Sequence, residues 1–88
     1  MKVSIIIAVY KNVKALELII NSLRDQTYTN FEIVIVEDGE YTPMKEYIST
    51  INDLEVIHTT QEDLGVRKAR SQNNGLLAAT GEYLIFID

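Results

Sequence analysis

Three stretches of this chain are apolar at nearly every position rather than at every second one. They lie at residues 3–9, 31–36 and 83–87, and the first two are rich in β-branched side chains. A strand with one solvated face alternates between apolar and polar residues, whereas a continuous apolar run indicates a strand that is covered on both faces. The chain is therefore expected to build a parallel sheet with helices packed against it.

Helical periodicity appears between these runs. One apolar stripe is formed by residues at positions i, i+3, i+4 and i+7, namely Leu16, Ile19, Ile20 and Leu23. Asn12 is placed to cap this first helix. Thr42 followed by Pro43 has the form of an N-cap with proline at the first helical position, so a short second helix is expected to about Ile51.

A weaker strand is expected at residues 54–58, nearer the sheet edge, and a third helix at residues 66–79, with Gly81 at its C-terminus. The predicted order is β-α-β-α-β-α-β, with connections long enough for right-handed crossovers. The fold class that follows is α/β: a three-layer open parallel sheet with strand order 3-2-1-4. A chain of 88 residues makes one domain, so residues 1–88 are taken as a single unit.

Composition excludes several classes of protein. The net charge of −5 argues against a nucleic-acid surface, which needs clustered Lys and Arg. The chain has no cysteine, which rules out disulfides and thiolate metal sites and agrees with a cytoplasmic location. No apolar run approaches the ~20 residues of a membrane span. A membrane association through residues beyond 88 stays open.

Acidic residues follow two of the predicted strands, at Glu37, Asp38 and Asp88. Ligands of open α/β sheets bind at the carboxyl ends of the strands, where the strand order reverses. Here that crevice would be lined by residues after Val9, after Val36 and after Ile87. We expect Asp38 and Asp88 to meet around it.

Glycine-rich phosphate loops are absent from the sequence. The first strand is followed by Tyr10-Lys11-Asn12-Val13, without the G-x-G-x-x-G of a dinucleotide-binding turn, and neither a P-loop nor a G-x-S-x-G elbow occurs. An acid-rich crevice without such a loop can hold a diphosphate through Mg²⁺ or Mn²⁺, which binds one or two carboxylates together with phosphate oxygens. A carboxylate there can also accept hydrogen bonds from a base imide or from ribose hydroxyls.

Five motifs, in order, resemble those of the nucleotide-sugar glycosyltransferases of the GT-A fold, in particular the inverting family two. VSIIIAVYKN at residues 3–12 resembles V-S-I-I-I-P-x-Y-N, with Ala8 in place of proline, and SLRDQT at residues 22–27 resembles S-L-x-x-Q-T. IVEDGE at residues 35–40 resembles V-D-D-G-S, with Glu37 for the first Asp and Glu40 for Ser.

The remaining two motifs lie in the second half of the chain. GVRKA, NNG and ATGEY between residues 65 and 83 resemble G-x-R-x-A, N-x-G and A-x-G-E-Y, and Asp88 falls at the first acid of the D-x-D motif. The resemblance covers essentially the whole chain. It implies a nucleotide-diphospho-sugar transferase-like half domain.

The resemblance implies nucleotide-binding positions at Ala8, Tyr10, Asp38, Arg67 and Asp88. Tyr10 would lie beside the nucleoside, and Asp38 would accept a hydrogen bond from the base, most often uracil. Arg67 would lie near the diphosphate or the ribose. Asp88 would contact the ribose or help to hold a divalent cation, Mn²⁺ or Mg²⁺.

The implied function is the donor-binding part of an inverting glycosyltransferase. Such an enzyme moves a sugar from a nucleotide sugar, here most often a UDP-sugar, to a hydroxyl of a saccharide or lipid-linked acceptor. The second acid of D-x-D, the catalytic base and the acceptor site would lie beyond residue 88. We therefore expect no transfer activity from residues 1–88 alone.

Structural alternatives stand beside these roles. Asp38 could simply turn the chain at Asp-Gly, and Glu37 could be a structural acid. Arg67 and Arg70 could coat a helix. Asn73 lies on the apolar helix face and favours a capping role in the interior.

Two further expectations concern the chain as a whole. His58 stands alone in the sequence, which argues against a metal-binding role. The departures from the family pattern at Ala8, Glu37 and Glu40 leave open a non-catalytic α/β module used for assembly or regulation. The strand at residues 83–87 would be an apolar sheet edge, so we also expect self-association as a homodimer through that edge.

Overall fold

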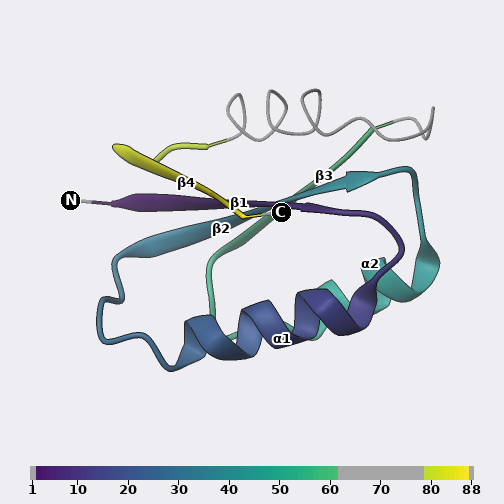
Figure 1. Cartoon of the computed structure of the whole chain (residues 1–88), viewed down its shortest axis with the longest axis horizontal. Coiled ribbons are helices and arrows are strands. Elements are labelled where there is room, and N and C mark those ends of the chain that lie inside the picture. The colour runs from purple at the N-terminus through teal and green to yellow at the C-terminus, as the bar shows by residue number, and fades with distance from the viewer. Residues whose placement is uncertain (1, 62–78, 88) are drawn as a thin grey trace.

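A computed structural model describes residues 2–61 and 79–87 of the chain (Figure 1). Its elements follow the order β1 (Val3–Val9), α1 (Val13–Arg24), β2 (Phe31–Asp38), α2 (Thr42–Ser49), β3 (Val56–Gln61) and β4 (Tyr83–Ile87). The four strands form one parallel sheet in the order β3-β2-β1-β4. The fold class and the strand order predicted from the apolar runs are thus confirmed.

The register fixes which residues share each edge of the sheet. β1 pairs with β2 from Val3 opposite Phe31 to Val9 opposite Glu37, and β1 pairs with β4 up to Ile7 opposite Ile87. Because all pairs are parallel, the carboxyl ends of β2, β1 and β4 face the same way. The first residues of these strands form the opposite edge.

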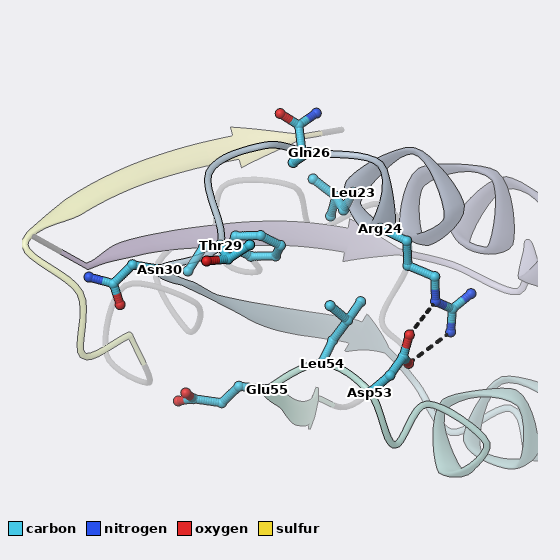
Figure 2. Close-up of a pocket in the computed structure, with 9 residues that line it drawn as sticks. Leu23, Arg24, Gln26, Thr29, Asn30, Asp53, Leu54 and Glu55 are labelled. Carbon is cyan, nitrogen blue, oxygen red and sulfur yellow. Dashed lines mark hydrogen bonds and ion pairs between the residues drawn. The ribbon is translucent and has the colours of Figure 1, made fainter.

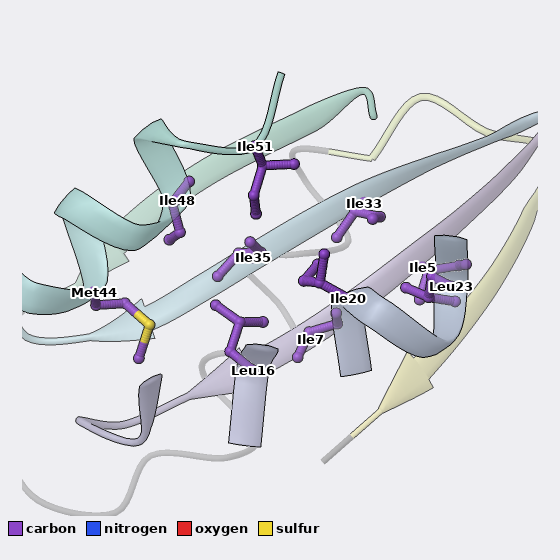
Figure 3. Close-up of a cluster of buried hydrophobic side chains, with 10 residues drawn as sticks. All are labelled: Ile5, Ile7, Leu16, Ile20, Leu23, Ile33, Ile35, Met44, Ile48 and Ile51. Carbon is purple, nitrogen blue, oxygen red and sulfur yellow. The ribbon is translucent and has the colours of Figure 1, made fainter. Parts of the chain in front are cut away.

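Helices α1 and α2 cover one face of the sheet (Figure 1). Alternate strand residues point to this face and pack with one stripe of each helix (Figure 3). The buried cluster consists of Ile5, Ile7, Leu16, Ile20, Leu23, Ile33, Ile35, Met44, Ile48 and Ile51. Three members of the predicted stripe of α1 are buried, and the fourth, Ile19, packs against the cluster from a partly buried position.

The other face of the sheet has a smaller buried cluster, formed by Ile6, Val34 and Val36 with Ile57 and Ala79 packed against it. The helix predicted at residues 66–79 lies outside the described residues except for Ala79, which is not helical. Within the described part of the chain, no helix is both long enough and apolar enough to cross a membrane.

Cap residues define where the helices begin. Asn12 caps α1 as predicted, because its side chain accepts a hydrogen bond from the Ala15 N–H at 3.0 Å. In α2 the predicted N-cap was wrong by one residue. Tyr41 is the N-cap and Thr42 already belongs to the helix, with Pro43 in its first turn.

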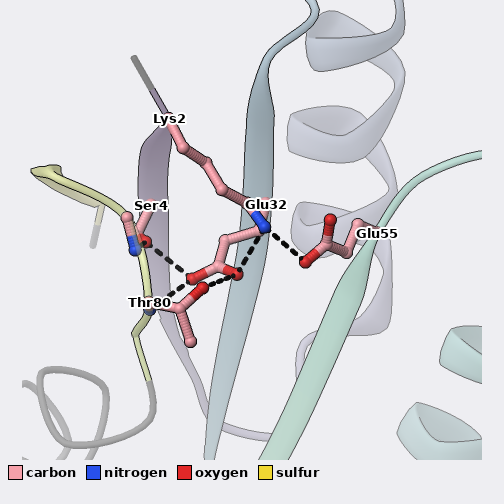
Figure 4. Close-up of polar contacts among 6 residues, drawn as sticks. Lys2, Ser4, Glu32, Glu55 and Thr80 are labelled. Carbon is pink, nitrogen blue, oxygen red and sulfur yellow. Dashed lines mark hydrogen bonds and ion pairs between the residues drawn. The ribbon is translucent and has the colours of Figure 1, made fainter.

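A buried carboxylate joins the strands at the amino-terminal edge (Figure 4). Glu32 is fully buried on β2. It accepts hydrogen bonds at 2.7 Å each from the Ser4 hydroxyl of β1 and from the N–H and hydroxyl of Thr80, which precedes β4. The Lys2 ammonium lies 3.4 Å away. Burial by itself would raise the pKa of Glu32, but these hydrogen bonds outweigh it and lower the pKa to about 2.

Gly81 lies in the bend before β4. Its N–H donates to Ser4 Oγ at 2.8 Å. A Cβ at this position would lie 2.5 Å from Ser4 Oγ and 2.8 Å from the Ser4 backbone nitrogen. The predicted helix before Gly81 lies outside the described residues, whereas the described contacts show that the absence of a side chain permits the close approach of the chain to β1.

Candidate functional site

Three of the predicted site residues lie at the carboxyl edge of the sheet. Ala8 on β1 pairs with Val36 on β2, and the next pair is Val9 with Glu37. Tyr10 directly follows β1, and Asp38 is the last residue of β2. The end of β4 reaches the same edge on the other side of β1, and neighbouring strands are about 4.8 Å apart. The carboxyl ends of β2 and β4 are therefore about 10 Å apart, with β1 between them.

Arg67 and Asp88, the other two predicted site residues, lie outside the described residues, as do Arg70 and Asn73. The expectation that Asp38 and Asp88 meet around one crevice therefore stays a prediction. The described residues show where β4 ends relative to β1. Ile87 is level with Ile7, one residue before Ala8.

The turn after β1 presents an exposed aromatic ring. Tyr10 is 51% exposed, and the Lys11 ammonium lies 5.2 Å from the centre of its ring. Lys11 has a φ of 53°, in the left-handed region that only glycine and a few polar residues adopt readily. This turn lets Asn12 cap α1 while Tyr10 stays at the edge.

Glu37 and Asp38 are neighbours on β2, so their side chains point to opposite faces of the sheet. Glu37 points to the face covered by the helices and is 1% exposed. One of its carboxylate oxygens accepts from the Tyr41 N–H at 2.9 Å, and the other lies 2.9 Å from His58 Nε2. Asp38 is 7% exposed and points to the opposite face, as Ala8 does.

The pairing of Glu37 with His58 was missed from the sequence, which left His58 without a partner. His58 lies opposite Ile35 in the β2–β3 register, so it shares the helix-covered face with Glu37. The predicted third strand, at residues 54–58, was also placed too early, since β3 runs from Val56 to Gln61. Because the predicted strand was shifted, the register between β2 and β3 could not be inferred from the sequence. That register is the one signal that could have paired Glu37 with His58.

The described residues do not by themselves fit a divalent cation. Among them, no group of three or more His, Asp or Glu side chains lies in a metal-binding arrangement. Both carboxylate oxygens of Glu37 are engaged inside the protein. Mn²⁺ and Mg²⁺ prefer several oxygen ligands, so a metal site at this edge would need residues outside the described part of the chain.

A groove of about 300 Å³ lies at the opposite end of the sheet (Figure 2). It is lined by Leu23, Arg24, Gln26, Thr29, Asn30, Phe31, Asp53, Leu54 and Glu55. The Arg24 guanidinium and the Asp53 carboxylate face each other there, with contacts at 2.9 and 3.2 Å. The hydrogen bond from Arg24 lowers the pKa of Asp53. The two charges satisfy each other, so we do not assign this groove to a charged ligand.

The sheet order and its carboxyl edge define a class of protein. An open parallel sheet in the order β3-β2-β1-β4 is the arrangement that this chain shares with solved glycosyltransferases of the GT-A fold. The family model described as glycosyl transferase family 2 matches residues 4–88. The chain belongs to this family.

Individual relatives agree with the family assignment. EpsH of Bacillus subtilis (strain 168), which is named as a glycosyltransferase, is 39% identical over 90 residues, covering 98% of this chain and 25% of EpsH. The crystal structure of Staphylococcus aureus TarS 1–349 superimposes with a TM-score of 0.89 at 28% identity, covering 100% of this chain and 27% of TarS.

A second solved structure was determined with ligands. It is the mannosyltransferase PcManGT from Pyrobaculum calidifontis, in complex with GDP-Man and Mn²⁺. Its TM-score is 0.72 at 26% identity, covering 93% of this chain and 25% of PcManGT. The chain thus spans about a quarter of the length of EpsH and of each of the two solved chains.

Proposed function

We propose that this chain binds the nucleotide of a sugar donor as part of a glycosyltransferase. The enzyme would move the sugar from a nucleoside diphosphate to a hydroxyl of a saccharide or lipid-linked acceptor, with inversion at the anomeric carbon. The observation that supports this most is the adjacency of Tyr10 and Asp38 at the carboxyl edge. An exposed ring beside a carboxylate can hold a nucleobase by contact with its face and by a hydrogen bond from its imide N–H.

UDP is the proposed donor nucleotide. The N3–H of uracil is a single donor that one carboxylate can accept, which matches Asp38. Guanine also presents N–H donors to a carboxylate, and GDP-Man is the ligand named for PcManGT. The carboxylate alone therefore does not select between the two bases, so UDP and GDP should be compared directly.

The remaining positions enter the proposal as family-implied roles. Ala8 would border the nucleoside from β1, Arg67 would lie near the diphosphate or the ribose, and Asp88 would help to hold Mn²⁺ or Mg²⁺. A divalent cation would neutralise the charge that develops on the departing diphosphate. The catalytic base and the second acid of D-x-D would come from further residues, so residues 1–88 alone are proposed to be inactive. A cytoplasmic location is part of the same proposal.

An NMR titration tests nucleotide binding. We expect UDP with Mg²⁺ to shift amide signals of Tyr10 and Asp38 and to leave Ser4 and Glu32, at the other edge, unchanged. Asp38→Ala should weaken UDP binding about tenfold or more, because a hydrogen bond to a charged group is lost. Asp25→Ala removes an exposed carboxylate just after α1 and serves as the control.

Shifts confined to the amino-terminal edge, or equal affinity of the Asp38 and Asp25 variants, would contradict the proposal. A wild-type chain that binds neither UDP nor GDP would instead favour the non-catalytic α/β module. That alternative is supported by Glu37, which stands where the family pattern has Asp and whose carboxylate is engaged with His58.

A further inference from the structure

The side chain of Glu37 closes a ring around the loop that follows β2. Glu37 Oε2 accepts from the N–H of Tyr41, four residues later, at 2.9 Å. The residues inside this ring are Asp38, Gly39 and Glu40, and Gly39 has a φ of 84° that favours glycine. The path of the backbone through Asp38 is therefore fixed at its far end by the carboxylate of the preceding residue.

His58 holds that carboxylate from the neighbouring strand. Its Nε2 lies 2.9 Å from Glu37 Oε1, and the two side chains are 21% and 1% exposed. A carboxylate buried to this extent needs a donor on each oxygen, because unpaired buried charge is costly. His58 can supply the second donor through a proton on Nε2.

We propose that Glu37 and His58 form a positioning pair that sets the loop at residues 38–40 and thereby aims Asp38 at the nucleotide. Neither residue contacts the ligand in this arrangement, because both point to the helix-covered face and Asp38 points to the other. The inference rests on the proposed function, since it explains how Asp38 is held for that role.

The positioning pair depends on the length of the Glu37 side chain. One oxygen reaches the Tyr41 N–H and the other reaches His58. The family-type residue, Asp, is shorter by one methylene and cannot keep both contacts from the same backbone position. Glu37→Asp is therefore expected to weaken UDP binding about threefold to tenfold, although it makes the sequence more like the family pattern.

Two variants of His58 separate the hydrogen bond from the packing. His58→Leu fills similar space but has no donor, whereas the amide nitrogen of His58→Gln can still donate to Glu37. With UDP and Mg²⁺, we expect the Leu variant to bind about tenfold more weakly than the wild-type chain and the Gln variant to stay within about threefold. Lys45→Ala, an exposed change on α2, is the control.

Loop order gives a readout that does not depend on the nucleotide. In ¹⁵N relaxation, the amides of Asp38, Gly39 and Glu40 should be as rigid as β2 in the wild-type and Gln variants and more mobile in the Leu variant. Long-range ¹H–¹⁵N spectra should show a proton on His58 Nε2. The circular dichroism spectrum of each variant checks that the sheet itself is retained.

The possible outcomes are distinguishable. If the wild-type chain binds UDP and both the His58→Leu and the His58→Gln variants bind UDP as tightly as the wild-type chain does, the positioning pair is wrong while the proposed function stands. If the wild-type chain binds no nucleotide, the ligand part of the inference falls with the proposed function, and the relaxation data decide whether the pair orders the loop. If the amides of residues 38–40 are as rigid in the His58→Leu variant as in the wild-type chain, the pair does not order the loop either.

Discussion

Glu32 shows how one buried acid ties three segments of the chain together. Its carboxylate accepts from β1, through Ser4, and from Thr80, ahead of β4, while Lys2 lies nearby. A carboxylate with several donors is favoured in its charged form, which is why its pKa falls to about 2 despite burial. Glu32 lies within an apolar run, between Phe31 and Ile33. A charged residue inside such a run is the sequence signal that could have predicted a buried carboxylate with partners.

Stability should fall in acid because of this residue. The pKa of Glu32 is lowered from 4.5 to about 2 on folding, so its contribution is complete above pH 4.5 and is lost as the pH drops towards 2. The difference corresponds to about 3 kcal/mol of unfolding free energy. Urea denaturation at a series of pH values should show this loss in the wild-type chain.

The variant Glu32→Gln isolates that contribution. At neutral pH it should lower the unfolding free energy by about 2–3 kcal/mol, and its stability should depend less on pH below 4.5 than that of the wild-type chain. Glu55→Gln, an exposed partner of Lys2, should cost less than about 1 kcal/mol. Equal acid sensitivity of Glu32→Gln and the wild-type chain would contradict this account.

At the scale of elements, the apolar runs predicted β1, β2 and β4, and the strand order was also predicted correctly, whereas β3 was placed too early. Continuous hydrophobicity at residues 3–9 and 31–36 identified the two central strands, and the helical stripe from Leu16 to Leu23 identified the helix between them. Strand ends were predicted less well. β2 extends through Glu37 and Asp38, because partners from Tyr41 and His58 allow an acid to be buried there, and sequence does not show such partners.

The candidate site was also predictable only in part, because the sequence indicates the strand ends but not the partners of each side chain. The rule that parallel strands deliver ligand contacts at their carboxyl ends placed Tyr10 and Asp38 at one edge, and the register agrees. The role of Glu37 depends on a contact with a strand 21 residues further along the chain. Such contacts follow from register, which periodicity alone does not determine.

Docking of β4 on β1 depends on a residue without a side chain. Gly81→Ala would place a Cβ 2.8 Å from the Ser4 backbone nitrogen, and backbone atoms cannot move aside cheaply. We expect a loss of about 1–3 kcal/mol in unfolding free energy, measured by thermal or urea denaturation. Thr80→Ser keeps both hydrogen-bonding groups of the neighbouring residue and should have little effect. Unchanged stability of Gly81→Ala would show that the bend before β4 does not need this close approach.

At the scale of the whole molecule, β4 is an exposed sheet edge. Among residues 2–61 and 79–87 it pairs only with β1, and its large apolar side chains are exposed, from 37% at Leu84 to 56% at Tyr83. Unpaired strand edges of this kind favour pairing between molecules. We therefore propose that the 88-residue chain self-associates through β4.

Sedimentation over a range of concentrations tests this proposal. The wild-type chain should form dimers at high micromolar concentration, and Ile85→Lys on β4 should shift it to monomer because a charge opposes edge pairing. Leu18→Lys is a matched control, since Leu18 is an equally apolar residue, 62% exposed on α1. A monomeric wild-type chain, or equal effects of the two lysines, would rule out association through β4.

The central claim is that a nucleotide binds at the carboxyl edge of this sheet. Paramagnetic broadening by Mn²⁺ in the presence of UDP measures it most directly, because the effect falls steeply with distance from the ion. We predict that amide signals of Val9, Asp38 and Ile87 broaden first, while those of Ser4, Glu32 and Tyr83 at the other edge persist. Broadening that begins at the amino-terminal edge, or that is the same with and without UDP, would contradict the claim.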